Sequence, residues 1–250
     1  MFALTALHIA FCRPARRDEY HAIADRHYER ALALFTPEVA NIRSENCYAV
    51  MVAVQLICFI SCARGPQPGE YLAFGDHGKS DWLVMFRGIR TTTENVDMQQ
   101  FAMSHILAVR ANGRPLPLSD EPFEYKTQLR ELRDYVAFLA QPSECEEYVH
   151  AADILHECYV NRYTGVDGEY HMGFTWLYQM TDEFLERLQR HDVIPLILYA
   201  HFVVLMHDME RFWYLRGWTH HVMRGIYEAL PAENKSWIRW PMAMVGWIAP

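Results

Sequence analysis

Apolar residues recur at steps of three and four along most of this chain, which is the spacing of one face of an α-helix. In residues 15–35, for example, aromatic and aliphatic side chains return at these steps between charged positions. The alternation of apolar and polar residues that marks a half-buried strand never persists beyond a few positions. We therefore predict an all-α protein, organised as a single domain over residues 1–250.

Prolines, glycines and helix-capping residues divide this pattern into separate helices. Thr36 and Pro37 predict that the second helix ends before them and that a brief turn follows. Two segments rich in glycine or proline, 65–78 and 111–122, are predicted loops, and the tail 231–250 is predicted to hold short helical turns. The predicted helices are 1–12, 15–35, 45–63, 82–92, 95–109, 123–140, 143–163, 173–179, 182–191, 194–214 and 219–230.

The longest apolar run, residues 193–206, is interrupted by His201. It is shorter than the roughly 18–20 residues that a bilayer crossing needs, so it predicts a buried core helix and no membrane partner. The apolar start of the chain has no basic leader and no cleavage site, which argues against a signal peptide. Six cysteines without a C-x-x-C pair indicate reduced thiols, and hence a cytoplasmic or nuclear location.

The net charge of -8 argues against direct contact with nucleic acid, because phosphate binding is driven by Lys and Arg. Neither glycine-rich loop follows a predicted strand, so neither is a dinucleotide or phosphate cradle. The cysteines and histidines also lack the spacing of a zinc site. We therefore expect no metal and no cofactor.

Several short blocks of the sequence carry a resemblance to a known family. The most specific are Arg216-Gly217-Trp218 and the run Trp237-Ile238-Arg239-Trp240-Pro241 near the end of the chain. The blocks lie at 3–10, 27–35, 45–50, 81–90, 182–185, 201–218 and 230–241. In this order they cover nearly the whole chain and resemble the helical regulatory domain of fungal zinc-cluster transcription regulators, in the sterol-uptake-control subgroup.

The resemblance implies an all-helical, ligand-binding fold that encloses a hydrophobic pocket suited to sterol-like molecules. It does not imply catalysis, because the family shares no catalytic motif. Members of the family carry a six-cysteine zinc cluster upstream of this domain, whereas this chain begins at Met1, inside the first helix of the domain. DNA binding is therefore not carried over, and we expect a free-standing gene product.

Polar side chains inside apolar segments are the candidates for chemistry. His201 interrupts the predicted core helix, and His156 and Tyr159 lie on or beside the predicted buried face of 143–163. Such an imidazole or phenol can act as a general acid or base, and it can equally be a core side chain bonded to a backbone carbonyl. The predicted lining of the pocket consists of side chains at helical spacing: Phe59, Trp82, Phe86, His171, Trp176, Phe202 and Leu205.

Two hypotheses in different classes follow. The first is a cofactor-free, Diels–Alderase-like cyclase of fungal secondary metabolism. It would bind a terpenoid, polyketide or sterol-like molecule and assist dehydration or cycloaddition by preorganisation, with acid–base help from His201, Tyr159 and His156. The alternative is a non-catalytic, ligand-sensing effector domain of a zinc-cluster transcription regulator. In both, the partner is a hydrophobic small molecule, and a homodimer or a dimer with a full-length homologue is left open.

Overall fold

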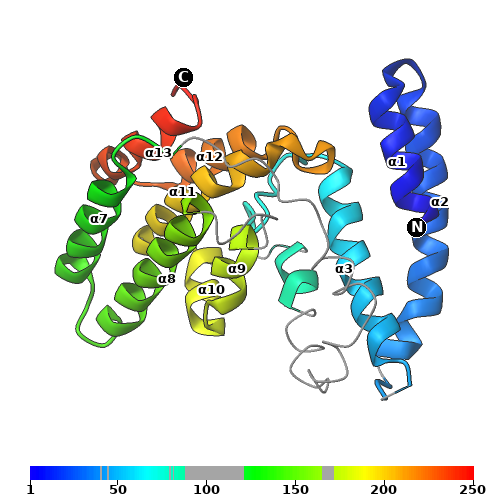
Figure 1. Cartoon of the computed structure of the whole chain (residues 1–250), viewed down its shortest axis with the longest axis horizontal. Helices are drawn as coiled ribbons and strands as arrows, with labels where there is room; N and C mark the ends of the chain where they lie inside the picture. Colours follow the sequence, from blue (N-terminus) through cyan, green and yellow to red (C-terminus); the bar gives the residue numbers. More distant parts are fainter. Residues whose placement is uncertain (40, 44, 79, 81, 88–120, 165–171) are drawn as a thin grey trace. The chain divides into compact units, whose positions relative to one another are not determined.

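The computed structural model describes residues 1–250 apart from 40, 44, 79, 81, 88–120 and 165–171, and its described part is helical (Figure 1). This confirms the predicted all-α class. Within the described ranges no strand forms, and Glu70, Gly75 and Gly78 make only isolated bridges. Contacts group the chain into two units. Unit 1 comprises Met1–Gly65, Asp81–Arg114 and Phe212–Leu215, and unit 2 comprises Pro66–Ser80, Pro115–Arg211 and Arg216–Pro250.

The single domain predicted from the sequence stays a prediction, so each unit is described by itself. Unit 1 begins with the paired helices α1 (Phe2–Cys12) and α2 (Arg17–Val39), which run side by side (Figure 1). The helix α3 (Cys47–Ala63), a helical segment at 82–87 and the short turn η3 (Trp213–Leu215) complete its described part. Small residues allow close packing between the helices, in a core of Ala3, Ala6, Leu7, Ala24 and Ile60.

The prediction for α2 was wrong in two respects. The helix continues through Pro37 to Val39, because a proline in the last turn keeps a helical φ and removes only one backbone hydrogen bond. The buried face is also narrower than the pattern suggests: Ala24 is buried and Ile23 and Tyr28 pack against the core of unit 1 while partly exposed, but Leu34 is 71% exposed. Helical periodicity therefore identified the element but not the extent of its buried face.

Unit 2 is built around α11 (Val193–Asp208). Every residue from Ile194 to Met206 is buried, and helices from both earlier and later in the sequence pack against α11. The surrounding elements are α7 (Tyr125–Leu139), α8 (Cys145–Tyr163), α9 (Met172–Gln179), α10 (Asp182–Gln189), η2 (Met209–Arg211), α12 (Trp218–Ala229), η4 (Ala232–Ile238) and α13 (Arg239–Met244).

The predicted core helix is therefore confirmed. By length and composition, Val193–Arg211 would pass as a membrane span, but 78% of its apolar window is buried within the protein. A helix that is apolar on all sides needs either lipid or a surrounding core, and here the other helices of unit 2 supply a core.

Specific polar contacts define the ends of two helices around α11. Thr181 begins α10 by accepting a hydrogen bond from the backbone N–H of Phe184, at 3.1 Å. Gly217, with a φ of 85°, turns the chain into α12, and the Glu210 carboxylate accepts a hydrogen bond from the N–H of Thr219 at 2.7 Å. A carboxylate at this position also interacts favourably with the positive end of the helix dipole.

Candidate functional site

The candidate acid–base pair lies in the interior of unit 2. Tyr159 on α8 is fully buried, and its hydroxyl donates a hydrogen bond of 2.6 Å to the backbone carbonyl of His201 on α11. The His201 side chain is 2% exposed, and its Nδ1 lies 2.9 Å from the carbonyl oxygen of Ile197. Since a carbonyl oxygen only accepts, Nδ1 carries the proton and the ring is held by its own helix.

Burial perturbs both groups in a direction that disfavours catalysis near neutral pH. It lowers the pKa of His201 to about 4, against the smaller opposing effect of the hydrogen bond to Ile197. It raises the pKa of Tyr159 well above the usual value for a phenol. A general base works best with a pKa close to the working pH, and a general acid likewise. His201 is therefore a weak base, and Tyr159 a weak acid, both fixed by structural hydrogen bonds.

The third candidate, His156, lies elsewhere on α8. It is exposed, whereas Tyr148, Leu155 and Tyr159 on the same helix are buried, as predicted for its apolar stripe. The structure therefore brings together Tyr159 and the backbone of His201, and leaves the His156 imidazole at the surface of unit 2.

Three of the predicted pocket residues fill the interior of unit 2. Trp176 is fully buried, and its indole N–H donates a hydrogen bond of 2.8 Å to the Ala151 carbonyl. Its ring stacks on Phe202 at 5.2 Å between centroids, and Phe202 in turn stacks on Tyr199 at 5.7 Å. Leu205 is also buried. These side chains act as core, and the hydrophobic pocket that they were expected to line stays a prediction.

Three further candidates belong to unit 1, where they form an aromatic–thiol cluster of Phe59, Cys62, Trp82, Phe86 and Tyr214. Trp82 stacks on Phe86 at 4.8 Å with nearly parallel rings, and Phe59 meets Tyr214 edge-on at 5.2 Å. Burial raises the pKa of Cys62 to about 12, and a hydrogen bond with Trp82 acts weakly in the opposite direction. The thiol therefore stays protonated and behaves as a small apolar group.

Within this cluster, Phe59 is 37% exposed, while Trp82 and Phe86 are buried. The cluster thus offers a partly exposed aromatic edge on an apolar background, which suits contact with a hydrophobic molecule. The remaining candidate, His171, lies outside the described residues.

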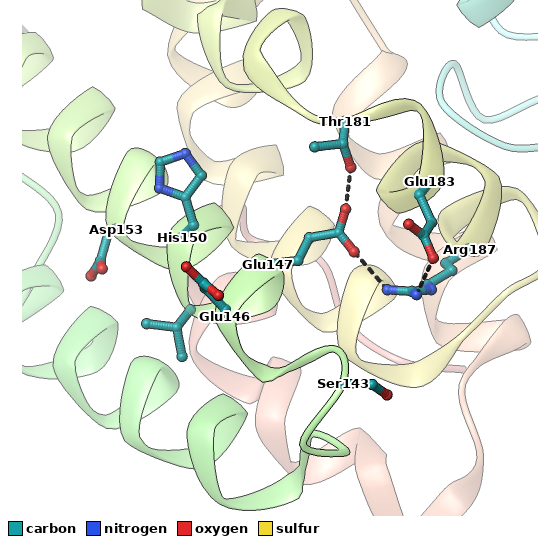
Figure 2. Close-up of a pocket in the computed structure, with 9 residues that line it drawn as sticks. Ser143, Glu146, Glu147, His150, Asp153, Thr181, Glu183 and Arg187 are labelled. Atoms are coloured by element: carbon teal, nitrogen blue, oxygen red, sulfur yellow. Dashed lines mark hydrogen bonds and ion pairs between the residues drawn. The ribbon is translucent and has the colours of Figure 1, made fainter.

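A polar groove of about 680 Å³ lies between α8 and α10 in unit 2 (Figure 2). His150 and Asp153 are at one end of it, and Arg187 is at the other (Figure 2). Asp153 is paired with Arg133 on α7 at 2.6 Å. The groove is lined by Ser143, Glu146, Glu147, Val149, His150, Asp153, Thr181, Glu183 and Arg187.

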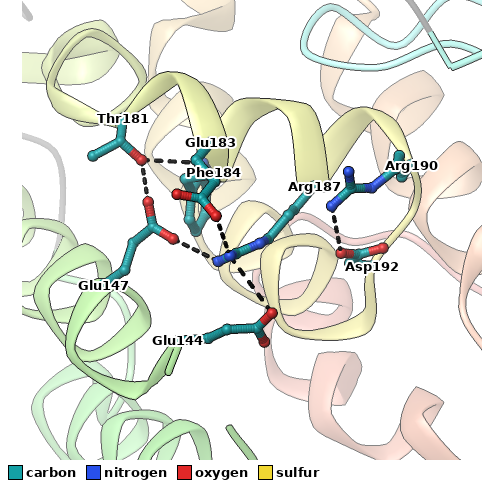
Figure 3. A network of polar contacts seen from close by, with 8 residues as sticks. All are labelled: Glu144, Glu147, Thr181, Glu183, Phe184, Arg187, Arg190 and Asp192. Atoms are coloured by element: carbon teal, nitrogen blue, oxygen red, sulfur yellow. Dashed lines mark hydrogen bonds and ion pairs between the residues drawn. The ribbon is translucent and has the colours of Figure 1, made fainter. Parts of the chain in front are cut away.

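Arg187 lies at the centre of a network of polar contacts beside the groove (Figure 3). Its nearly buried guanidinium lies 2.6 Å from Glu147 and from Glu183, and 3.5 Å from Glu144. The Thr181 hydroxyl donates to the other oxygen of Glu147. Charged hydrogen bonds of this kind fix α8 against α10 because each buried charge has an oppositely charged partner.

This groove was missed by the sequence analysis. Glu183 and Arg187 are four residues apart on one predicted helix, a spacing that indicates an ion pair. The sequence contains no pattern that predicts Glu147 as their neighbour. Glu147 and Glu183 are bound by Arg187, and Glu147 also by Thr181. Among the described residues no group of three His, Cys, Asp or Glu side chains is placed to hold a metal ion. The arrangement is chemically a structural ion-pair network.

Comparison of the chain with models of known protein families, with curated proteins and with solved structures finds no match.

Proposed function

We propose that this chain is a non-catalytic, ligand-sensing effector domain of the zinc-cluster regulator type, which binds a hydrophobic, sterol-like molecule without transforming it. The observation that carries the proposal is the hydrogen bonding of Tyr159 and His201. Both polar groups of the candidate catalytic site are bound to backbone carbonyls in the interior of unit 2. The order of sequence blocks that resembles the family supports the same class of function.

The cyclase hypothesis requires more of these residues than their environment favours. Acid–base assistance needs a group that is close to the reacting atoms and has a pKa near the working pH. His201 is neutral down to a pH of about 4, and moving its Nδ1 proton would break the bond to Ile197. A sensing domain needs only apolar contact area and shape, which these hydrogen bonds leave unaffected.

The aromatic–thiol cluster is the proposed ligand contact. Phe59 is the partly exposed member, packed edge-on against Tyr214, and the stacked rings of Trp82 and Phe86 are buried. Apolar contact contributes about 25 cal/mol for each Å² that is removed from water. Part of this gain is offset by the translational and rotational freedom that the bound molecule loses, so a sterol has to bury an extended apolar area against this cluster.

Energy transfer from tryptophan to dehydroergosterol, a fluorescent sterol, tests the proposal on the full chain. We expect saturable transfer that falls by more than half in the variant Trp82→Leu and is retained in Trp247→Leu, whose tryptophan packs on Tyr227 in unit 2. Mass spectrometry of the extracted sterol should recover it unchanged. Absence of saturable transfer would refute sterol sensing.

A second experiment, product analysis, separates the sensing hypothesis from the cyclase hypothesis. Incubation with terpenoid and polyketide precursors should return the same mixture of compounds as a boiled control. A new product that disappears in the variant Tyr159→Phe would contradict the sensing proposal and favour the cyclase.

A further inference from the structure

The polar groove between α8 and α10 has the size of a small-molecule site. Its volume of about 680 Å³ lies within the range of roughly 300–1,000 Å³ that is typical of pockets for organic ligands. Side chains from both helices line it, and Val149 is its apolar residue. The groove is therefore large enough for an organic molecule, and the kind of molecule that fits depends on the charges on its walls.

The walls of the groove carry more negative than positive charge. The carboxylates that line the groove or share Arg187 are those of Glu144, Glu146, Glu147, Asp153 and Glu183. The guanidinium groups paired with them are those of Arg133 and Arg187. Five carboxylates against two guanidinium groups leave an excess of three negative charges.

Most of this excess arises around Arg187, because its single guanidinium serves three carboxylates at 2.6–3.5 Å. The side chains of Glu144 and Glu147 are only 28% and 21% exposed. Like charges that are partly buried are screened less by solvent than charges at the open surface, so they repel one another more strongly. A second cation at this end would be repelled by one guanidinium and attracted by three carboxylates, so it would reduce the repulsion.

Glu146 supplies the remaining negative charge. Within the part of the chain that the structure describes, no hydrogen bond or ion pair reaches its carboxylate, which is exposed. It lies on α8, between the Asp153 end and the Arg187 end of the groove (Figure 2). Glu183, on α10, is 68% exposed and can accept a further donor besides Arg187. The two helices thus offer carboxylates at separate positions along the groove.

This arrangement suits ammonium groups better than a metal ion. A metal ion needs several ligands that converge on one point, and among the described residues no three His, Cys, Asp or Glu side chains do so. An ammonium group carries three donors and can be held by one or two carboxylates. Alkyl segments between such groups can pack against an apolar side chain, and Val149 supplies one in the groove.

We propose that the polar groove binds a small organic polyamine, a linear molecule whose ammonium groups are joined by short alkyl segments. One ammonium group binds Glu146, a second binds Glu183 beside Arg187, and the alkyl segment contacts Val149. The proposal goes beyond the sensing of a hydrophobic molecule and does not depend on it, because the groove belongs to unit 2 and the aromatic–thiol cluster to unit 1.

Isothermal titration calorimetry of the full chain with spermidine, at neutral pH and low ionic strength, tests the site. We expect saturable binding of one spermidine per chain. Salt at about 0.15 M, where the Debye length is roughly 8 Å, should weaken the binding several-fold. n-Butylamine carries a single ammonium group and reaches one carboxylate position, so it should bind several-fold more weakly than spermidine.

Matched variants separate the groove from the overall charge of the chain. Glu146→Gln should raise the Kd of spermidine about two- to fivefold, which is the effect of losing an exposed ion pair. Glu146→Gln/Glu183→Gln should raise it about four- to 25-fold, because the two positions act separately. The control Glu157→Gln/Glu186→Gln removes two exposed carboxylates of the same helices that do not line the groove, so it should bind like the wild type. Circular dichroism checks that each variant is folded.

Three results would overturn the proposal. The first is a wild type that shows no saturable binding of spermidine. The second is an equal loss of binding in the groove variants and in the control, because it would mean general attraction to a chain of net charge -8. The third is tighter binding of a lysine-rich peptide than of spermidine with the same dependence on Glu146, which would assign the groove to a protein partner instead.

Discussion

Replacing Gly225 by alanine should destabilise the protein, although the same change stabilises most helices. Gly225 lies within α12, and its φ is not positive, so the backbone itself accepts an alanine. A Cβ atom built there would lie 2.4–2.6 Å from three carbon atoms of the Tyr71 ring. Real Cβ atoms do not approach other carbons this closely, so either the ring or the helix must move.

The size of the effect follows from two opposing contributions. Alanine in a helix interior gains up to about 1 kcal/mol over glycine. Loss of a buried aromatic side chain from a core costs about 3–5 kcal/mol when the whole side chain is removed. Tyr71 would shift rather than vanish and would keep part of its contacts. We therefore expect a net loss of about 2–3 kcal/mol in the free energy of unfolding.

Urea unfolding followed by tryptophan fluorescence and circular dichroism measures this loss. In a thermal scan it corresponds to a decrease in Tm of about 5–10 °C for a chain of this size. The control is the pair Tyr71→Ala and Tyr71→Ala/Gly225→Ala. Without the ring, the alanine at 225 should regain its ordinary stabilising effect of up to about 1 kcal/mol. A single variant as stable as the wild type, or a double variant that gains nothing, would refute the close packing of α12 on Tyr71.

Three further predictions concern polar side chains of unit 2. Replacing Arg162 by methionine should lower the free energy of unfolding, measured in urea, by about 3–5 kcal/mol. The nearly buried carboxylate of Asp208, 2.5 Å from the guanidinium of Arg162, would lose its closest partner. An effect below about 1 kcal/mol would contradict a buried pair. Acidification from pH 6.5 to 4 should lower the free energy of unfolding by about 3 kcal/mol through His201 alone. The folded pKa of His201, about 4, lies below its unfolded value, so stability is lost as the pH falls between the two. The variant His201→Gln should lose this part of the pH dependence. Replacing Thr181 by alanine should lower the free energy of unfolding by about 1–2 kcal/mol in the same assay, because α10 loses its N-cap and Glu147 loses a hydrogen-bond donor. Unchanged stability would contradict both contacts.

The sequence predicted the helices of unit 2 well because their patterns are strong. The run 193–206 contains almost nothing but apolar residues, and it forms the buried helix α11. The buried stripe of α8 was also predicted correctly from its spacing. The pattern of α2 is equally periodic, yet that helix is mostly exposed. Periodicity describes which residues share a face, whereas burial depends on what packs against that face.

Polar partners that are distant in the sequence were not predictable in the same way. Asp208 lies close to Glu210 and Arg211 in the sequence, but it pairs with Arg162 on α8 and is nearly buried. Arg211 does lie 3.5 Å from Asp208, as the local spacing suggested. Local spacing predicts contacts within a helix, but it does not predict which residue of another helix packs against a given side chain.

The segment Pro66–Ser80 shows a similar limit. Its glycines and prolines correctly predicted a loop, with Gly69 and Gly78 both at positive φ. These residues determine where the chain can turn, but not whether the turn lies at the surface. The one available signal was the apolar run at 71–74, which is unusual in an exposed loop and forms its buried part.

Three buried aromatic side chains of unit 2 share one kind of partner. Tyr159, Trp176 and Tyr199 each donate to a backbone carbonyl of another segment, to His201, Ala151 and Tyr71 respectively. Each bond satisfies a group that would otherwise be costly to bury, and it also fixes the position of the ring. A catalytic centre instead needs a polar group kept available for the substrate. These three bonds hold their donors against the protein's own backbone, so each ring has a defined position in the core of unit 2.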